Sequence, residues 1–184
     1  MSIQQDAHVV VFVADYVGVD AASKINALGA GFAISGVQPT GMVAPQHIAV
    51  LVDVPSKYAG NEFAVSVELR NETIGGVVQL LGATGAPDAL RVQQMAKVER
   101  PVIPGVYLPE TMFCRVQMML AFPNGLPLAP GMYAWRVELD GQTSPGWHAS
   151  FYVPGPPPQP VFGGPAGPSD IPMLPTTDDP SSEG

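Results

Sequence analysis

The sequence predicts an all-β protein: an antiparallel β-sandwich, immunoglobulin-like or jelly-roll-like, with about nine strands and an extended Pro/Gly-rich C-terminal tail. Three observations support this fold class. Apolar residues alternate with polar ones in short segments, turn signals rich in Gly, Pro and Asn recur roughly every 8–12 residues, and proline becomes abundant from Pro154 onward. No long segment has the 3.6-residue period of an amphipathic helix.

The first four expected strands cover residues 8–16, 25–37, 45–55 and 62–71. Residues 8–16 and 45–55 are nearly continuous apolar runs, which suits strands that are covered on both faces. Residues 62–71 alternate instead, which predicts one buried face and one wet face. The expected buried face consists of Phe63, Val65, Val67 and Leu69. The expected solvent face consists of Glu62, Ser66, Glu68 and Arg70.

Five further strands are expected at residues 75–82, 90–99, 111–122, 132–141 and 147–154. Residues 100–110 contain three prolines and are predicted to form an extended crossing segment. The expected strand at 90–99 alternates only loosely, so a helical turn around residues 88–98 is an alternative for it. The dipeptide Asp140-Gly141 is typical of a hairpin turn.

The chain divides into a β-sandwich domain, residues 1–153, and a Pro/Gly-rich acidic tail, residues 154–184. The tail contains ten of the 21 prolines and no Lys or Arg. Its composition favours extended polyproline II structure interrupted by flexible glycines, so it cannot form a packed core. Isolated apolar residues are expected to bind a protein partner, namely Val161, Phe162, Ile171, Met173 and Leu174. The alternative is a solvated tail with no specific partner.

The net charge of −8 and the lack of a basic cluster among only eight Lys and Arg residues argue against nucleic acid as a partner. No apolar stretch approaches the ~20 residues of a membrane-spanning helix, and the N-terminus lacks the basic start of a signal peptide. The sequence therefore predicts a soluble protein that is cytoplasmic when made, with association with a virion as a more specific expectation.

The residues that could carry chemistry do not form a recognised motif. The histidines His8, His47 and His148 have no second ligand at a metal-binding spacing. Cys114 lies in an apolar strand and is expected to be buried, and Ser35 lacks the first glycine of a nucleophile elbow.

Two further candidates are also interpreted as structural. Gly29 and Gly31 lack the third glycine and the helix of a dinucleotide-binding loop, which favours a bulged or closely packed strand. The carboxylate pairs Asp53 with Glu68 and Glu138 with Asp140 are expected to face solvent rather than a shared cleft. The sequence thus predicts no catalytic residue, no metal site, no cofactor and no enzymatic activity.

Aromatic residues concentrate in the last two expected strands. Tyr133, Trp135, Trp147 and Phe151 are predicted to lie in the core where two sheets meet. If one aromatic face were exposed instead, it would serve as a platform for carbohydrate, with the 83–88 and 123–130 loops beside it.

Three motifs carry a resemblance to a known group. They span Ala14–Phe32, Ile48–Pro55 and Pro130–Gly141, and the last reads P-G-x-Y-x-W-R-V-x-x-D-G. In these motifs the chain resembles a family of small β-sandwich proteins of actinobacteria and their phages, a domain of unknown function. The resemblance covers most of residues 8–153 and implies a fold but no activity.

The predicted function is that of a non-catalytic structural or interaction protein. Its most specific form is an accessory protein of a phage virion, such as a capsid decoration protein, whose C-terminal arm contacts neighbouring subunits. Protein partners in a homo-oligomer or larger assembly follow from this hypothesis. The alternative is a β-sandwich module that binds a small ligand or a glycan.

Overall fold

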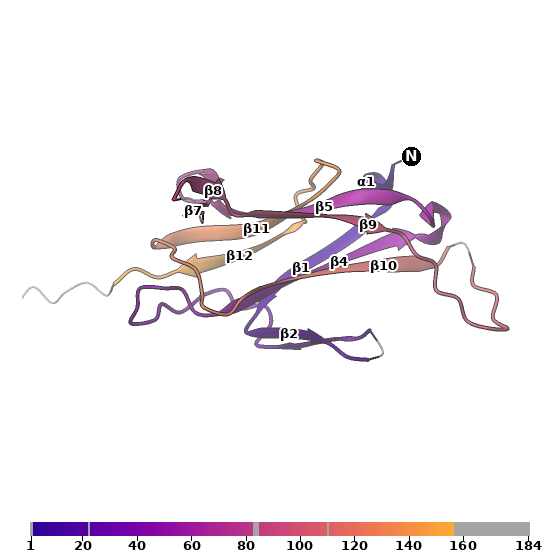
Figure 1. Ribbon diagram of the computed structural model, residues 1–184, viewed down its shortest axis with the longest axis horizontal. Helices are drawn as coiled ribbons and strands as arrows, with labels where there is room; N and C mark the ends of the chain where they lie inside the picture. The colour runs from indigo at the N-terminus through magenta and orange to yellow at the C-terminus, as the bar shows by residue number, and fades with distance from the viewer. Residues whose placement is uncertain (1, 22, 83–84, 110, 157–184) are drawn as a thin grey trace, which may run out of the picture.

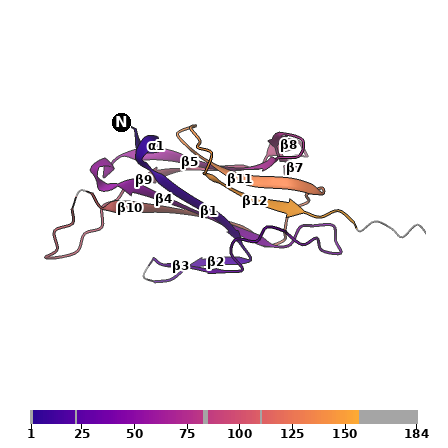
Figure 2. The ribbon, with the colours of Figure 1, turned by 180° about the vertical axis from the view of Figure 1, so that it is seen from behind.

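The protein is an antiparallel β-sandwich of two sheets, as expected from the sequence (Figures 1 and 2). The structure is a computed structural model that describes residues 2–21, 23–82, 85–109 and 111–156. One sheet has the order β1 (His8–Ala14), β4 (Gln46–Pro55), β10 (Phe113–Phe122). The other has the order β12 (His148–Val153), β11 (Gly131–Leu139), β5 (Glu62–Asn71), with β6 (Gly76–Val77) and β9 (Arg91–Lys97) both paired to β5.

The order of the long strands is that of an immunoglobulin-like sandwich. Along the chain they are β1, β4, β5, β9, β10, β11 and β12. The first, second and fifth form one sheet and the other four form the second, as strands A, B, E and G, F, C, C′ do in immunoglobulin-like domains. Two small hairpins complete the β structure, β2 (Tyr16–Val19) with β3 (Ile25–Leu28), and β7 (Gln79–Leu81) with β8 (Pro87–Ala89).

The core lies between the two sheets and follows the alternation in the sequence. On β5, Phe63, Val65, Val67 and Leu69 are all at most 1% exposed, which confirms the predicted buried face. The facing positions of β4 are equally buried: Ile48, Val50, Val52 and Val54. Because every second side chain of a strand points to the same face, the two runs interlock into one apolar layer.

The predicted solvent face of β5 is partly wrong. Ser66 and Glu68 are only 3% and 4% exposed. Glu68 receives a hydrogen bond from Arg70 (Oε1–Nη1 2.9 Å) and lies 3.8 Å from Arg91 of β9, which also pairs with Glu138 of β11. The arginine side chains therefore cover the carboxylate, and their charges compensate for its loss of water.

Two predicted strands are shorter than expected. The segment 8–16 breaks at Asp15, whose amide donates to Leu28 O, so that β1 ends and β2 begins a new hairpin. The segment 25–37 forms a strand only as far as Leu28, because Gly29 and Gly31 have φ of +62° and +78°. A Cβ on Gly29 would lie 2.0 Å from Asp15 Oδ2, so this glycine permits a close approach.

The remaining local expectations have mixed outcomes. Residues 87–97 form β8 and β9, so the helical turn considered there is wrong. Residues 100–109 contain no strand and run as the predicted crossing segment. Among the described residues the helical elements are α1 (Ile3–Asp6), which the sequence did not predict, and the 3-10 turn η1 (Ser56–Tyr58). None of these helices is long and apolar enough to cross a membrane.

The motif at Pro130–Gly141 forms β11 and the turn that follows it. Tyr133, near the start of β11, donates its hydroxyl proton to Ala129 O at 2.8 Å, and Asn71 Nδ2 lies 3.3 Å from the same hydroxyl. A tyrosine bonded to backbone just upstream of this strand is the tyrosine corner of immunoglobulin-like sandwiches. At the other end of the motif, Asp140 and Gly141 have φ of +47° and +76°, the two positive values that a type I′ hairpin turn requires. The motif thus specifies fold geometry.

Candidate functional site

The hairpin β2–β3 lies against the outer face of the β1–β4–β10 sheet (Figure 1). Ala14, Val17 and Ala49 form a small second core under it, with Phe12 and Ile25 packed alongside. At the tip of the hairpin, Gln117 Nε2 of β10 donates to Ser23 O at 3.2 Å. The hairpin therefore covers part of this sheet face and leaves the rest open.

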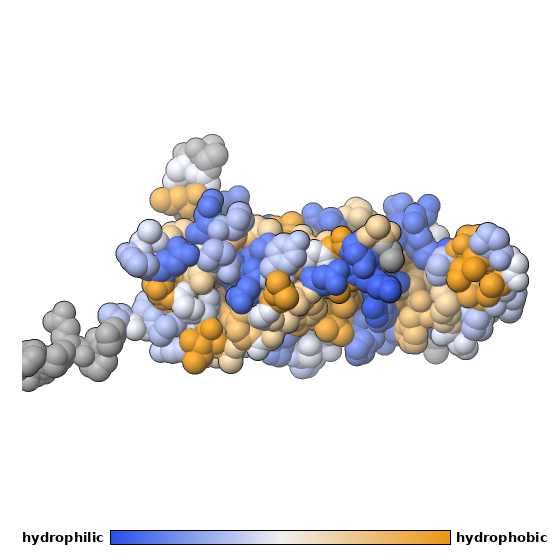
Figure 3. Space-filling view, turned by 90° about the horizontal axis from the view of Figure 1, so that it is seen from below, coloured by the Kyte–Doolittle hydropathy of each residue, from blue (hydrophilic) through white to orange (hydrophobic). Residues whose placement is uncertain are grey.

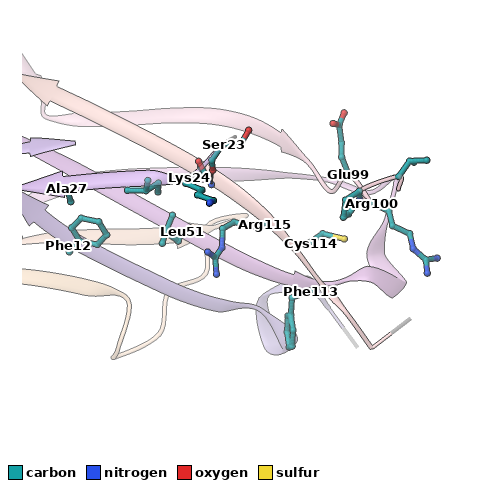
Figure 4. Close-up of a pocket in the computed structure, with 14 residues that line it drawn as sticks. Phe12, Ser23, Lys24, Ala27, Leu51, Glu99, Arg100, Phe113, Cys114 and Arg115 are labelled. Carbon is teal, nitrogen blue, oxygen red and sulfur yellow. Dashed lines mark hydrogen bonds between the residues drawn. The ribbon is translucent and has the colours of Figure 1, made fainter. Parts of the chain in front are cut away.

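A cleft of about 1020 Å³ lies beside the hairpin, between its tip and the segment that follows β9. The sheet contributes Phe12, Leu51, Phe113, Arg115 and Gln117 to its floor. Figure 4 shows Ser23 and Lys24 on the hairpin side and Glu99 and Arg100 on the opposite wall, with Arg115 between them. The cleft is open to solvent.

Most of the charged side chains that line the cleft are basic. Lys24, Arg100 and Arg115 line it, against the single carboxylate of Glu99. Arg115 binds Asp53 through two hydrogen bonds of 2.7 Å, and these bonds raise the pKa of its guanidinium. No ion pair to Lys24 is found among the described residues. Because Asp53 already neutralises Arg115, the basic groups of the cleft that favour an anionic partner are Lys24 and Arg100.

An exposed apolar segment projects next to the cleft, at the end of the molecule where β10 begins (Figures 1 and 2). In this crossing segment Val102 and Tyr107 are 90% and 84% exposed, and Ile103 and Val106 are half exposed. Figure 3 shows an apolar group at this end of the face that carries the hairpin. Side chains of this kind gathered on one loop are typical of a surface that binds another protein.

The aromatic residues predicted from the sequence lie inside the sandwich. Tyr133, Trp135, Trp147 and Phe151 are all at most 9% exposed. Tyr133 stacks on Phe151 with ring centroids 5.8 Å apart, and Trp135 stacks on Phe122 at 5.3 Å. These four rings cannot form an exposed platform. Of the aromatic residues in the last two strands, Tyr152 is 40% exposed and is the one available to the glycan-binding alternative.

The candidate chemical residues are spread over the molecule. Cys114 is 1% exposed and Ser35 is 3% exposed. His8 and His47 lie at opposite ends of the β1–β4 pair, and His47 Nδ1 is 2.9 Å from Asp15 O. No group of three His, Cys, Asp or Glu side chains suited to a metal ion occurs in the described ranges.

The predicted carboxylate pairs do not converge on a shared cleft. Asp53 pairs with Arg115 on the outer face of one sheet, whereas Glu68 pairs with arginines on the outer face of the other. Glu138 binds Arg91, and Asp140 accepts hydrogen bonds from Ala64 N and Gln4 in the turn after β11. Each of these carboxylates therefore has a structural partner.

The predicted tail anchors, Val161, Phe162, Ile171, Met173 and Leu174, lie outside the described residues. The sequence did not predict the cleft. The cleft forms because the β2–β3 hairpin folds back over the sheet that contains β1, whereas the sequence predicted β1 and the start of β2 as one continuous strand. One sequence signal could have indicated the surface beside the cleft. Residues 101–109 contain a group of apolar residues between prolines, which is too short for a strand and too apolar for an ordinary loop.

Comparisons with known proteins do not assign a family. No protein-family model matches the chain, and no curated protein matches it. Among solved structures, it is similar to the alkylpurine DNA glycosylase AlkC of Pseudomonas fluorescens, bound to DNA containing an abasic site analog, with a TM-score of 0.33 and 10% identity. The match covers 67% of this chain but spans only 28% of the length of that chain. A similarity this low supports no inference about the fold or activity of this chain. The resemblance to actinobacterial and phage proteins remains a prediction.

Proposed function

We propose that this chain is a non-catalytic interaction protein that joins protein subunits in a larger assembly. The observation that carries the proposal is the exposed apolar crossing segment at residues 101–109, in which Val102 and Tyr107 are almost fully open to solvent. Large apolar side chains exposed together are unfavourable in water and become favourable when a partner covers them. The immunoglobulin-like body holds this segment at one end of the molecule.

The arrangement of polar residues is consistent with this proposal. In the described part of the chain, the carboxylates of Asp53, Glu68 and Glu138 are bound to arginines. These contacts stabilise strand pairing, and none of them places a nucleophile beside a base as acyl or glycosyl transfer would require. The sequence-based form of the proposal, an accessory protein of a phage virion, is tested by measuring its copy number in purified particles. A stoichiometric copy number would support it, and absence from the particles would contradict it.

Site-specific photo-crosslinking tests the interaction itself. A photoreactive amino acid replaces Tyr107 in the full chain, and a matched control replaces Ile74, which is 82% exposed on a turn at the other end of β5. The expected result is a single crosslinked product at position 107, in near-stoichiometric yield, and none at position 74. Equal labelling at both positions, or labelling at neither, would contradict an interaction through the crossing segment.

A further inference from the structure

We infer that the cleft beside the β2–β3 hairpin is the binding site for the C-terminal arm, residues 157–184, of a second copy of this chain. The inference rests on the proposed function and deepens it, because it names the partner and the two surfaces that meet. The apolar residues of the arm would lie on the floor of the cleft, and its carboxylates would lie near Lys24 and Arg100.

The chemistry of the arm is complementary to that of the cleft. The arm has no basic residue and four carboxylates, at Asp170, Asp178, Asp179 and Glu183. Its apolar residues form two groups, Val161-Phe162 and Ile171–Leu174. The cleft offers the basic groups of Lys24 and Arg100 and an apolar floor that includes Phe12, Leu51 and the half-exposed ring of Phe113. Complementary charge of this kind favours one partner over others and speeds the encounter.

The prolines of the arm reduce the cost of binding. A segment with this proline content already favours extended polyproline II backbone, so fewer backbone conformations are lost when it is held in a groove. The glycines at 163 and 164 lie between the two apolar groups and allow the chain to adjust its direction there.

The geometry of the body favours an arm from another copy. β12, which precedes the arm, lies beside the start of β4: Tyr152 O accepts from Ser35 N, and the nearby Gly36 O accepts from Ala44 N just before β4. Phe113 instead pairs with Pro55 at the other end of β4. The two places are therefore about the length of β4 apart, and its ten residues span about 30 Å at the rise of a strand. Phe162 follows Pro156 by six residues, which reach at most about 21 Å.

An arm therefore cannot bring its first apolar group to the Phe113 end of the cleft in its own body. Only the later group, Ile171–Leu174, lies far enough along the chain to do so. An arm from a neighbouring copy can place both groups. Such a contact joins two different surfaces of identical subunits, so it leads to a ring or to an open chain of copies.

Sedimentation equilibrium of the full chain over a range of concentrations tests the inference. One variant changes the cleft, Lys24→Glu, and another changes the arm, Phe162→Ser. A second cleft variant, Phe113→Ser, alters an exposed ring rather than a charge. Lys97→Glu on the exposed side of β9 is the charge-matched control, and Gln159→Ala is the control in the arm.

The expected result has three parts. The wild type self-associates, and rising salt weakens this association because the charges are exposed. Each cleft or arm variant weakens it by about tenfold or more, as loss of a central contact does, while the two controls leave it unchanged. A mixture of Lys24→Glu with Phe162→Ser forms a 1:1 complex, because the intact arm of the first can enter the intact cleft of the second.

Other outcomes overturn the inference in distinguishable ways. If Phe162→Ser weakens association but neither cleft variant does, the arm binds elsewhere and only the assembly proposal stands. A wild type that remains monomeric, with an arm that resists protease until Lys24→Glu releases it, would mean that the cleft holds the arm of its own chain. A monomer with an unprotected arm would reject the inference, and crosslinking at Tyr107 would then decide the proposed function separately.

Discussion

Tyr133 shows at the scale of one residue how this fold is fixed. Its ring is 2% exposed, and its hydroxyl joins the end of the β10–β11 connection, at Ala129 O, to the end of β5, at Asn71. Replacing it with phenylalanine keeps the ring stack on Phe151 but leaves the Ala129 carbonyl without this donor. We expect Tyr133→Phe to lower the free energy of unfolding by about 1–3 kcal/mol, measured by urea denaturation.

The control for this change is Tyr152→Phe, because Tyr152 is 40% exposed and water can replace its hydroxyl contacts. We expect that variant to unfold within about 0.5 kcal/mol of the wild type. Equal losses in the two variants would show that the buried hydroxyl of Tyr133 stabilises the fold no more than an exposed hydroxyl does.

Gln46 is the clearest local conflict in the core. Its side chain is fully buried at the start of β4, and neither its amide nitrogen nor its carbonyl oxygen has a hydrogen-bond partner among the described residues. An unsatisfied buried amide costs about 1–3 kcal/mol. Methionine has similar volume and no such requirement, so Gln46→Met is expected to raise the midpoint of thermal unfolding. A lower midpoint would reveal a polar partner for this amide.

Single residues divide into those the sequence could place and those it could not. The apolar positions of β5 could be placed because a two-residue period repeats over the whole strand. The burial of Glu68 could not, because it depends on Arg91 of β9, a strand 23 residues later in the chain that reaches across to cover it. One strand's pattern carries no information about which charged neighbours flank it.

At the scale of elements, the connection between β10 and β11 depends on one glycine. Gly125 has φ of +74°, and a Cβ there would lie 1.8 Å from Val43 O. Gly105 has a similar φ of +75°, but a Cβ there would meet nothing. Left-handed backbone costs a non-glycine residue roughly 1–2 kcal/mol. Gly105→Ala should lose about that amount of stability, and Gly125→Ala clearly more, because the Val43 carbonyl must also move.

Chemical denaturation of the two alanine variants measures this difference. If the two variants lost the same stability, the β10–β11 connection would be able to shift away from Val43 without cost. The close approach between these two segments would then not be a requirement of the fold.

The N-terminal helix α1 is attached by a small charged cluster. Asp6 Oδ2 lies 2.5 Å from Lys57 Nζ and accepts a hydrogen bond from the Tyr58 hydroxyl at 2.8 Å. The bond from Lys57 and then that from Tyr58 lower the pKa of Asp6 below its ordinary 3.8, and the bond to Asp6 raises the pKa of Lys57 above 10.5.

These shifts define the pH range in which α1 is held. Because the pKa of the Asp6 carboxyl is lowered, its ionised form stabilises the folded protein above about pH 4. This stabilisation is lost as the pH falls through the pKa of the folded state. Because the pKa of Lys57 is raised, its charged form stabilises the folded protein below about pH 10.5. This stabilisation is lost as the pH rises through the pKa of the folded state. We expect the Ala7 amide, which donates to Ile3 O, to lose protection from hydrogen exchange below pH 4. In Asp6→Asn the protection should be weak at neutral pH as well, and an unchanged profile would contradict the assignment.

The elements also show where sequence patterns stop being sufficient. Alternating segments predicted β5 and β11 of one sheet, because burial against a facing sheet imposes the two-residue period, and nearly continuous apolar runs predicted β1 and β4 of the other. The sequence did not predict the break at Asp15 or the short β2–β3 hairpin, because a continuous apolar run does not indicate where the chain leaves one sheet and begins a separate hairpin. The cleft beside the hairpin was therefore missed with it.

At the scale of the whole molecule, the arm differs from the body in composition. The core runs from Ile3 to Val153, and β12 completes the second sheet by pairing Val153 with Gly131. The sequence predicts a boundary after this strand, because the proline content of the following residues disfavours further regular strands. It could not predict what the arm binds, because a binding partner is not encoded in local propensity.

The last prediction tests this division directly. Removing residues 155–184 leaves every strand pair and every member of the described core in place, so the free energy of unfolding should change by less than about 0.5 kcal/mol. The midpoint of thermal unfolding, followed by circular dichroism at low protein concentration, should then stay within about 2 °C of the full chain. Low concentration matters because self-association would itself stabilise the full chain by mass action. A cooperative loss of the β-sheet signal in the shortened protein would show that the arm is part of the folding unit, and the division into body and arm would have to be abandoned.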